Sequence, residues 1–174
     1  TNDFGTVSIL SSNNATLVDT NLLTLGASAV SGALNVTAHD LDVTGSVSVT
    51  GATFINESNG DGIGLGGTSV AGGLNISGTE LELITSAGFT LTTSGDVVVD
   101  GILGANSDNV SGTFTIDSGN NVSFSNADST FNALDVQADD GIIISRNITT
   151  DTGALALDGD ANTGADGSDN ITIA

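Results

Sequence analysis

Segments of similar sequence recur along this chain at intervals of about 40 residues. Val-Ser-Gly-Ala-Leu-Asn-Val at 30–36 returns as Val-Ala-Gly-Gly-Leu-Asn-Ile at 70–76 and as Val-Ser-Gly-Thr-Phe-Thr-Ile at 110–116, with a looser copy at 150–157. Asp-Gly-Ile tripeptides, the first at 61–63, keep nearly the same interval. Such fixed periods are typical of stacked repeats, in which each unit buries its apolar face only against its neighbours.

Within each repeat, apolar and polar residues alternate over short stretches, as in Leu34-Asn-Val36 and Val47-Ser-Val49. This alternation predicts half-buried strands, and the Gly, Asn, Asp and Ser between them suit turns. About six stretches per 40 residues make two coils, each of roughly 20 residues and about three short strands. We therefore expect an all-β chain, folded as a right-handed parallel β-helix (β-solenoid), because parallel crossovers prefer that hand. A sandwich of hairpins accounts less well for the fixed period, and no stretch shows helical periodicity.

The whole chain, 1–174, is expected to form one elongated β-solenoid domain. Residues 1–29 are irregular in spacing and supply the first coils, while 158–170 form an acidic loop rich in Gly and Asp. If the period of about 40 residues equals two coils, Leu34, Leu74 and Phe114 occupy equivalent inward positions.

The charge balance limits the partners of this chain. It has 21 acidic residues, one Arg and no Lys, for a formal net charge of −20. Such a chain repels phosphate backbones and anionic lipid surfaces, so neither nucleic-acid binding nor direct membrane insertion is expected. The sequence also has no apolar run of transmembrane length and no cysteine. An extracellular or cell-surface location fits this composition.

The strongest local motif lies in the acidic loop and resembles a twelve-residue calcium-binding loop. Oxygen-bearing side chains stand at its positions 1, 3, 5, 9 and 12: Asp158, Asp160, Asn162, Asp166 and Asp169. The pattern departs from a calcium loop because position 6 is Thr and position 12 is Asp instead of Glu. A solvated acidic turn is the alternative interpretation, and Ca²⁺ is the one cofactor that the sequence suggests.

No residue pattern predicts catalysis, and we do not expect an enzyme. His39 is followed by Asp40, but a Ser-His-Asp site needs a positioned base and a preformed oxyanion site. Glu80 and Glu82 alternate with leucines and are expected to point outward from a strand, in the places that Asp40 and Asp42 hold one repeat earlier. We interpret this acidic stripe as a solvated face, because enzymes that cleave acidic sugars also need cations.

Residues 34–45 and 148–157 resemble the repeats of filamentous-haemagglutinin-type large exoproteins, which are β-helical adhesins and surface fibres of bacteria. The resemblance implies an extracellular, rod-forming and non-catalytic protein, with an adhesive role toward a receptor that the sequence does not identify. Two alternatives remain. One is a calcium-binding surface-layer component; the other is a carbohydrate-binding or carbohydrate-cleaving β-helix, which would need aromatic platforms although the chain has no Trp or Tyr.

Both ends of the sequence, 4–9 and 170–174, alternate as strands do, without a recognisable polar cap. An uncovered strand edge pairs with another chain, and a heterologous contact that does not close generates a filament. We therefore expect copies to associate end to end, each completing a coil of the next.

Overall fold

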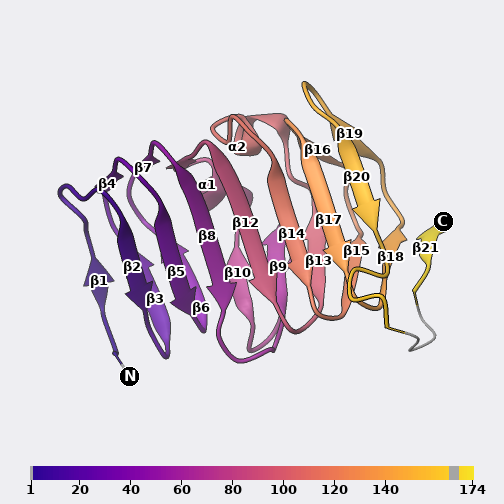
Figure 1. The fold of residues 1–174 in the computed structure, drawn as a ribbon, viewed down its shortest axis with the longest axis horizontal. Coiled ribbons are helices and arrows are strands. Elements are labelled where there is room, and N and C mark those ends of the chain that lie inside the picture. Colours follow the sequence, from indigo (N-terminus) through magenta and orange to yellow (C-terminus); the bar gives the residue numbers. More distant parts are fainter. Residues whose placement is uncertain (1, 165–168) are drawn as a thin grey trace.

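Every strand pairing in the described part of the chain is parallel. The computed structural model describes residues 2–164 and 169–174. Its longest sheet has seven strands that run side by side along the molecule (Figure 1). In spatial order they are β2 (Ala15–Val18), β5 (Leu34–Ala38), β8 (Ala52–Glu57), β12 (Gly88–Thr93), β14 (Phe114–Ser118), β17 (Leu134–Ala138) and β20 (Leu155–Asp158).

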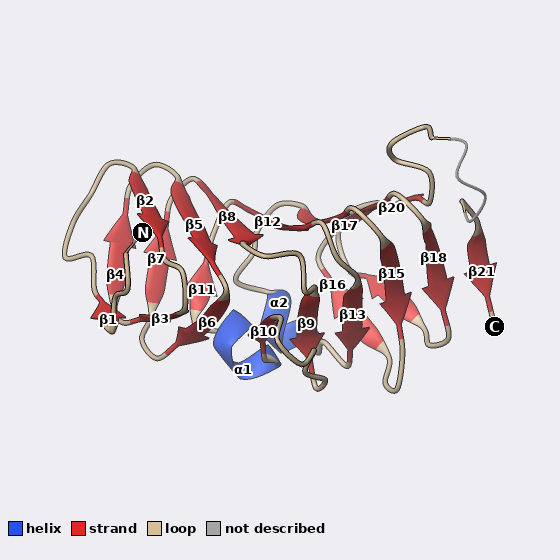
Figure 2. Ribbon diagram, turned by 90° about the horizontal axis from the view of Figure 1, so that it is seen from below, coloured by secondary structure: helices blue, strands red, loops and turns tan. Residues whose placement is uncertain are grey.

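The remaining strands form four shorter sheets. A three-stranded and a six-stranded sheet follow one another along the molecule (Figure 2). They contain β1 (Thr6–Val7), β3 (Leu22–Leu25) and β6 (Asp40–Val43), then β10 (Leu74–Ile76), β9 (Ile63–Gly66), β13 (Val97–Asp100), β15 (Asn121–Phe124), β18 (Gly141–Ile144) and β21 (Ile171–Ile173). The last two sheets contain β4 (Ser28–Val30), β7 (Val47–Val49) and β11 (Ile84–Thr85), and β16 (Ser129–Phe131) with β19 (Ile148–Thr150).

The chain visits these sheets in turn, so that successive strands of one sheet are separated by one circuit. Ala15 pairs with Leu34, and Phe114 pairs with Leu134, which gives circuits of about 20 residues at these places. The circuits on either side of β12 are longer, because Thr53 pairs with Phe89 and Phe89 pairs with Phe114. The expectation of a predominantly β chain with parallel strands is therefore confirmed for the described residues.

The core lies between the sheets and is made of in-register columns of apolar side chains. In the seven-stranded sheet, Phe89 and Phe114 are paired, and their rings stack with centroids 4.9 Å apart. Phe131, from the adjoining sheet, lies against Phe114 at 5.1 Å. All three side chains are buried, so aromatic packing reinforces the middle of the core.

The expected equivalence of Leu34, Leu74 and Phe114 is wrong at Leu74. Leu34 and Phe114 belong to one inward column of the seven-stranded sheet, whereas Leu74 pairs with Ile63 in the six-stranded sheet. The reason is that residues 67–83 leave the regular circuit. They turn back after β9, add β10 beside it, and then continue through a helix to β11.

Two one-turn helices, α1 (Gly78–Leu81) and α2 (Gly104–Ser107), correct the expectation that the chain has no helix. Four residues are too few to show the 3.6-residue period on which that expectation depended. At α1 a local signal was present. Glu80 N–H donates to Ser77 Oγ at 3.3 Å, and Ser77 N–H donates to Glu80 Oε2 at 2.8 Å, which is a capping box.

A buried carboxylate joins the segment before β1 to the end of β2. Asp19 Oδ2 accepts from Phe4 N–H at 2.6 Å, and Asp19 Oδ1 accepts from Asn21 N–H at 2.9 Å. The bond from Asn21 makes the largest contribution, and together these bonds lower the pKa of Asp19 below its ordinary value. The stability from Asp19 is therefore present above that ordinary value and is lost as the pH falls through the lower folded pKa.

Leu74→Ala should lower the free energy of unfolding by about 2–5 kcal/mol, because Leu74 is fully buried and its removal leaves a cavity. Urea denaturation followed by circular dichroism measures this change. Leu103→Ala is the matched control, since Leu103 is 64% exposed and its truncation should cost under about 0.5 kcal/mol. Equal unfolding midpoints for the two variants would contradict the placement of Leu74 in the core.

Candidate functional site

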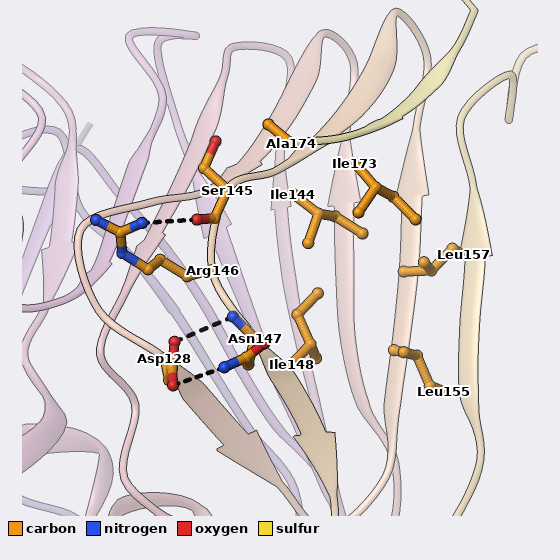
Figure 3. Close-up of a pocket in the computed structure, with 10 residues that line it drawn as sticks. All are labelled: Asp128, Ile144, Ser145, Arg146, Asn147, Ile148, Leu155, Leu157, Ile173 and Ala174. Carbon is orange, nitrogen blue, oxygen red and sulfur yellow. Dashed lines mark hydrogen bonds between the residues drawn. The ribbon is translucent and has the colours of Figure 1, made fainter.

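A pocket of 500 Å³ lies at the end of the fold formed by β19, β20 and β21, the last strands of their sheets (Figure 3). Its apolar wall combines side chains from four strands. They are Ile144, Ile148, Leu155, Leu157 and Ile173.

This wall is the uncovered end of the core. Leu155 and Leu157 continue the inward columns of Leu134 and Val136, which are buried. Leu155 is 41% exposed, however, because no further strand lies over β20. Burying apolar area that is in contact with water favours association, and the cost of ordering the two partners offsets part of that gain.

The polar rim of the pocket is held by hydrogen bonds. Arg146 Nε donates to Asn126 O at 2.6 Å, and its Nη1 donates to Ser145 O at 2.9 Å. The Asp128 carboxylate accepts from Asn147 N–H at 3.1 Å and from Asn147 Nδ2 at 3.0 Å. The side-chain bond from Asn147 chiefly lowers the pKa of Asp128, with a smaller contribution from Arg146, so the rim carries one fixed charge of each sign near neutral pH.

The opposite end of the fold is also apolar. The half-buried side chains that pack against this end of the core come from β1, β2 and the segments around them: Phe4, Val7, Ile9, Ala15 and Leu17. β1 and β2 are the first strands of their sheets. The two ends thus present similar surfaces, each with an apolar centre and an unpaired strand edge.

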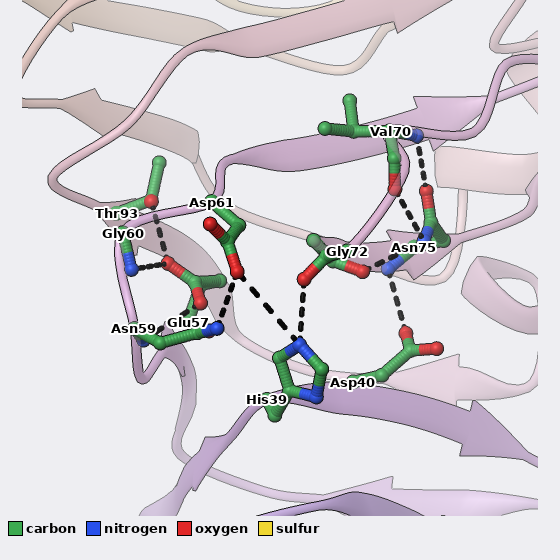
Figure 4. A network of polar contacts seen from close by, with 11 residues as sticks. His39, Asp40, Glu57, Asn59, Gly60, Asp61, Val70, Gly72, Asn75 and Thr93 are labelled. Carbon is green, nitrogen blue, oxygen red and sulfur yellow. Dashed lines mark hydrogen bonds and ion pairs between the residues drawn. The ribbon is translucent and has the colours of Figure 1, made fainter.

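A second polar cluster lies at the boundary between β6 and β10, which we call the seam (Figure 4). These neighbouring strands share no backbone ladder among the described pairings. Side chains supply the bonds instead. Asp40 Oδ1 accepts from Asn75 N–H at 2.9 Å, and Glu80 Oε1 accepts from Val43 N–H at 3.0 Å.

His39 extends the seam toward the loop at 67–73. Its Nε2–H donates to Gly72 O at 2.6 Å, and Asp61 Oδ2 lies 4.0 Å from the same nitrogen. Asn75 holds this loop from the other side, because its Oδ1 accepts from Val70 N–H at 2.6 Å. The bond to a backbone carbonyl gives His39 a structural role in holding the loop at 67–73.

Glu57 is the buried carboxylate of this region. It accepts from Gly60 N–H at 2.6 Å, from Asn59 N–H at 2.8 Å and from the Thr93 hydroxyl at 3.0 Å. Three donors satisfy its lone pairs, so Glu57 closes the turn after β8.

The expectation of a strand around Glu80 and Glu82 is wrong. The chain forms α1 there, which contains Glu80 and has Glu82 as its C-cap. The two glutamates therefore do not alternate along one sheet face. Glu80 nevertheless lies beside Asp42. Burial, followed by the charge of Glu80 and a hydrogen bond to it, raises the pKa of Asp42.

A raised folded pKa means that ionised Asp42 opposes folding near neutral pH. The stability from Asp42 is complete below its unfolded pKa, about 3.9, and is lost as the pH rises through the folded value. Asp42→Asn should therefore raise the melting temperature at pH 7, and this gain should shrink toward pH 3. Calorimetry across that range measures it, with exposed Asp151→Asn as the control for net charge. A lower melting temperature for Asp42→Asn at pH 7 would contradict the assignment.

The residues of the predicted calcium loop are only partly described. Asp158 Oδ1 accepts from Asp160 N–H at 3.1 Å, and Asn162 Oδ1 accepts from Gly164 N–H at 2.6 Å. Asp169 is half-buried before β21, and Asp166 lies outside the described residues. Within 2–164 and 169–174, no group of three or more His, Asp or Glu side chains is arranged to hold a metal ion.

The sequence reasoning did not find the pocket. Its lining combines strands that are distant in the chain, although the alternation at 155–157 and 171–173 marked apolar side chains there. Neither described helix is long and apolar enough to cross a membrane.

Comparison with known proteins gives one result. A family model described as repeats of unknown function (DUF5649) matches residues 12–66, which span β2 to β9. No curated protein and no solved structure matches the chain. The match supports the repetitive character of the N-terminal third.

Proposed function

We propose that this chain is a right-handed parallel β-helix with a structural role, as a rod on a microbial cell surface whose copies associate end to end. The observation that carries this proposal is the continuity of the inward columns, which run the length of the seven-stranded sheet and are uncovered at both ends. The extracellular location and the adhesive role follow from the resemblance to large exoproteins.

Support for the solenoid comes from the order in which the chain visits the sheets. From β2 to β8 the strands belong in turn to the seven-stranded sheet, the β3–β6 sheet and the β4–β7 sheet, and this order then repeats. From β14 to β21 the chain again visits three sheets per circuit. Parallel crossovers of this kind are right-handed in nearly all proteins.

Support for end-to-end association comes from the register. Leu17 and Leu157 are the first and last members of one inward column. A second copy placed beyond β20 would set its Leu17 on Leu157 and continue the ladder without a change of direction. Both apolar ends would then be buried, and the edge backbone groups would gain partners.

The net charge of −20 opposes this contact, since every copy repels every other. Arg146, the single cationic side chain apart from His39, lies at the pocket. Salt screens repulsion, with a Debye length of about 8 Å at 0.15 M ionic strength. Association should therefore strengthen as NaCl is added.

Leu17→Asp and Leu157→Asp should each give a monomer, because each places a charge in one apolar end. Mixed in equal amounts, they should form a dimer and nothing larger, since each variant keeps one intact end. Sedimentation velocity distinguishes these species. Thr16→Asp and Ala156→Asp are matched controls on the outer side of the same strands, and they should assemble as the parent does.

The association fails as a proposal if the parent protein stays monomeric and folded at high concentration in NaCl. It also fails if the mixture of the two end variants remains monomeric. Negative-stain images test the rod separately, because an unbranched particle of constant width is expected whether or not copies associate.

A calcium-binding surface-layer component is the second candidate function. The observation that favours it is Asp160 Oδ1, which is buried and has no hydrogen-bond partner among the described residues. A bound cation would satisfy this oxygen.

If Ca²⁺ binds this loop, CaCl₂ should raise the melting temperature. At a hundredfold excess over the dissociation constant, the free energy of unfolding should increase by about 2.7 kcal/mol. Asp158→Asn with Asp160→Asn should abolish the rise. MgCl₂ at equal ionic strength is the control for screening. An unchanged melting temperature of the parent protein in CaCl₂ would contradict calcium binding and favour the interpretation of the loop as a solvated turn.

A further inference from the structure

The outer surface of the seven-stranded sheet is uncharged over its first four strands. One column of outward side chains there is Thr16, Asn35, Phe54 and Thr90, which are in register on β2, β5, β8 and β12. Beyond β12 the same column continues with Thr115 and then the acidic Asp135. The change from neutral to acidic therefore falls within one sheet.

A second outward column runs beside the first. It contains Val18, Thr37, Asn56 and Thr92 on the same four strands, and continues with Asp117 on β14. Burial and the nearby Asp139 raise the pKa of Asp117. The two columns over β2, β5, β8 and β12 make up what we call the neutral face. None of the 21 acidic residues of the chain, and not its one Arg, lies at these positions.

Phe54 is the aromatic group of the neutral face. Of the six Phe, four are fully buried and Phe4 packs against the core, whereas Phe54 is 36% exposed. It lies between Asn35 and Thr90 in its column. An exposed aromatic ring therefore lies beside an amide and a hydroxyl on neighbouring strands.

The polar groups around Phe54 are available to a ligand. Within the described part of the chain, the side-chain amide of Asn35 and the hydroxyls of Thr37, Thr90 and Thr92 make no hydrogen bond. They are held by the ladder below them, so a ligand would not have to order the backbone that carries them. Their spacing along each column is that of neighbouring strands, about 4.8 Å.

We propose that the neutral face binds an uncharged polysaccharide that lies across the strands, with one sugar ring stacked on Phe54. A sugar ring has an apolar C–H face that suits an aromatic ring and a rim of hydroxyls that suits Asn and Thr. An extended glycan presents one sugar over a length comparable with the strand spacing of about 4.8 Å. Successive sugars can therefore meet successive residues of a column.

The charge of the protein selects the class of polysaccharide. An anionic glycan would be repelled by the net charge of −20, and the neutral face offers no cation to offset that repulsion. A neutral glycan is not repelled. β2 is the first strand of the sheet, but the outward side chains of the neutral face are not the inward apolar side chains that form the two ends, so the inference does not depend on end-to-end association.

Native gel electrophoresis through hydroxyethyl cellulose, glucomannan or xylan tests the proposal, with a gel lacking polysaccharide as the reference. At least one of these neutral glycans should retard the parent protein. Phe54→Ala should weaken the apparent affinity by about tenfold or more, as truncation of a central aromatic contact does. Thr90→Val, which removes a hydroxyl and keeps the shape, should weaken it less.

Leu103→Ala is the matched control, because it removes another exposed apolar side chain, at the N-cap of α2 and outside the seven-stranded sheet. Circular dichroism verifies that each variant is folded. The proposal is overturned if none of the three glycans retards the parent protein, if Phe54→Ala is retarded as the parent is, or if polygalacturonate is the only polymer that binds. It is also overturned if sedimentation shows that Phe54 instead joins two copies of the chain through this face.

Discussion

In-register parallel stacking is the constraint on which the rest of this structure depends. A parallel ladder gives each strand the hydrogen-bond partners of its neighbour, and it also places like positions directly over one another. The core is therefore a set of columns, in which Phe89 lies on Phe114 and Leu34 lies near Thr53. Thr53 is tolerated there because its hydroxyl donates to Ser86 Oγ at 3.0 Å. The lack of proline in the chain has the same cause, since proline cannot donate to a ladder.

Where strand stacking is interrupted, side-chain carboxylates accept the hydrogen bonds that the carbonyls of a neighbouring strand would otherwise accept. Asp40 and Glu80 accept backbone N–H groups across the seam, and Asp19 does the same for Phe4 in the first coil. Part of the acidic composition is thus structural, because these side chains satisfy donors that no neighbouring strand reaches. Some of the acidic side chains therefore serve as internal hydrogen-bond acceptors, and others lie on the outer surface.

The sequence was sufficient for strands and parallel pairing, because alternation and turn residues act over a few positions. The expected circuit of roughly 20 residues holds at β2–β5 and β14–β17 but not on either side of β12. It was insufficient at 67–83, where the path of the chain depends on contacts between distant segments. The Ser77–Glu80 capping box was readable locally, but the His39 bond to Gly72 needed the fold. The apolar pocket likewise required several strands to be brought together, and the neutral face required the register. For the predicted calcium loop, Asp166 lies outside the described residues, so the predicted set of five ligands stays a prediction.

The position of β10 has a consequence for how this chain folds during synthesis. β10 follows β9 in the sequence, yet it lies between β6 and β9 in space. A fold that grew one coil at a time from the N-terminus would place β9 directly against β6, in the position that β10 finally takes. We therefore expect residues 63–76 to be added as a pair of strands, once both have been synthesised. The strands from β12 onward carry no such requirement and can be added in sequence.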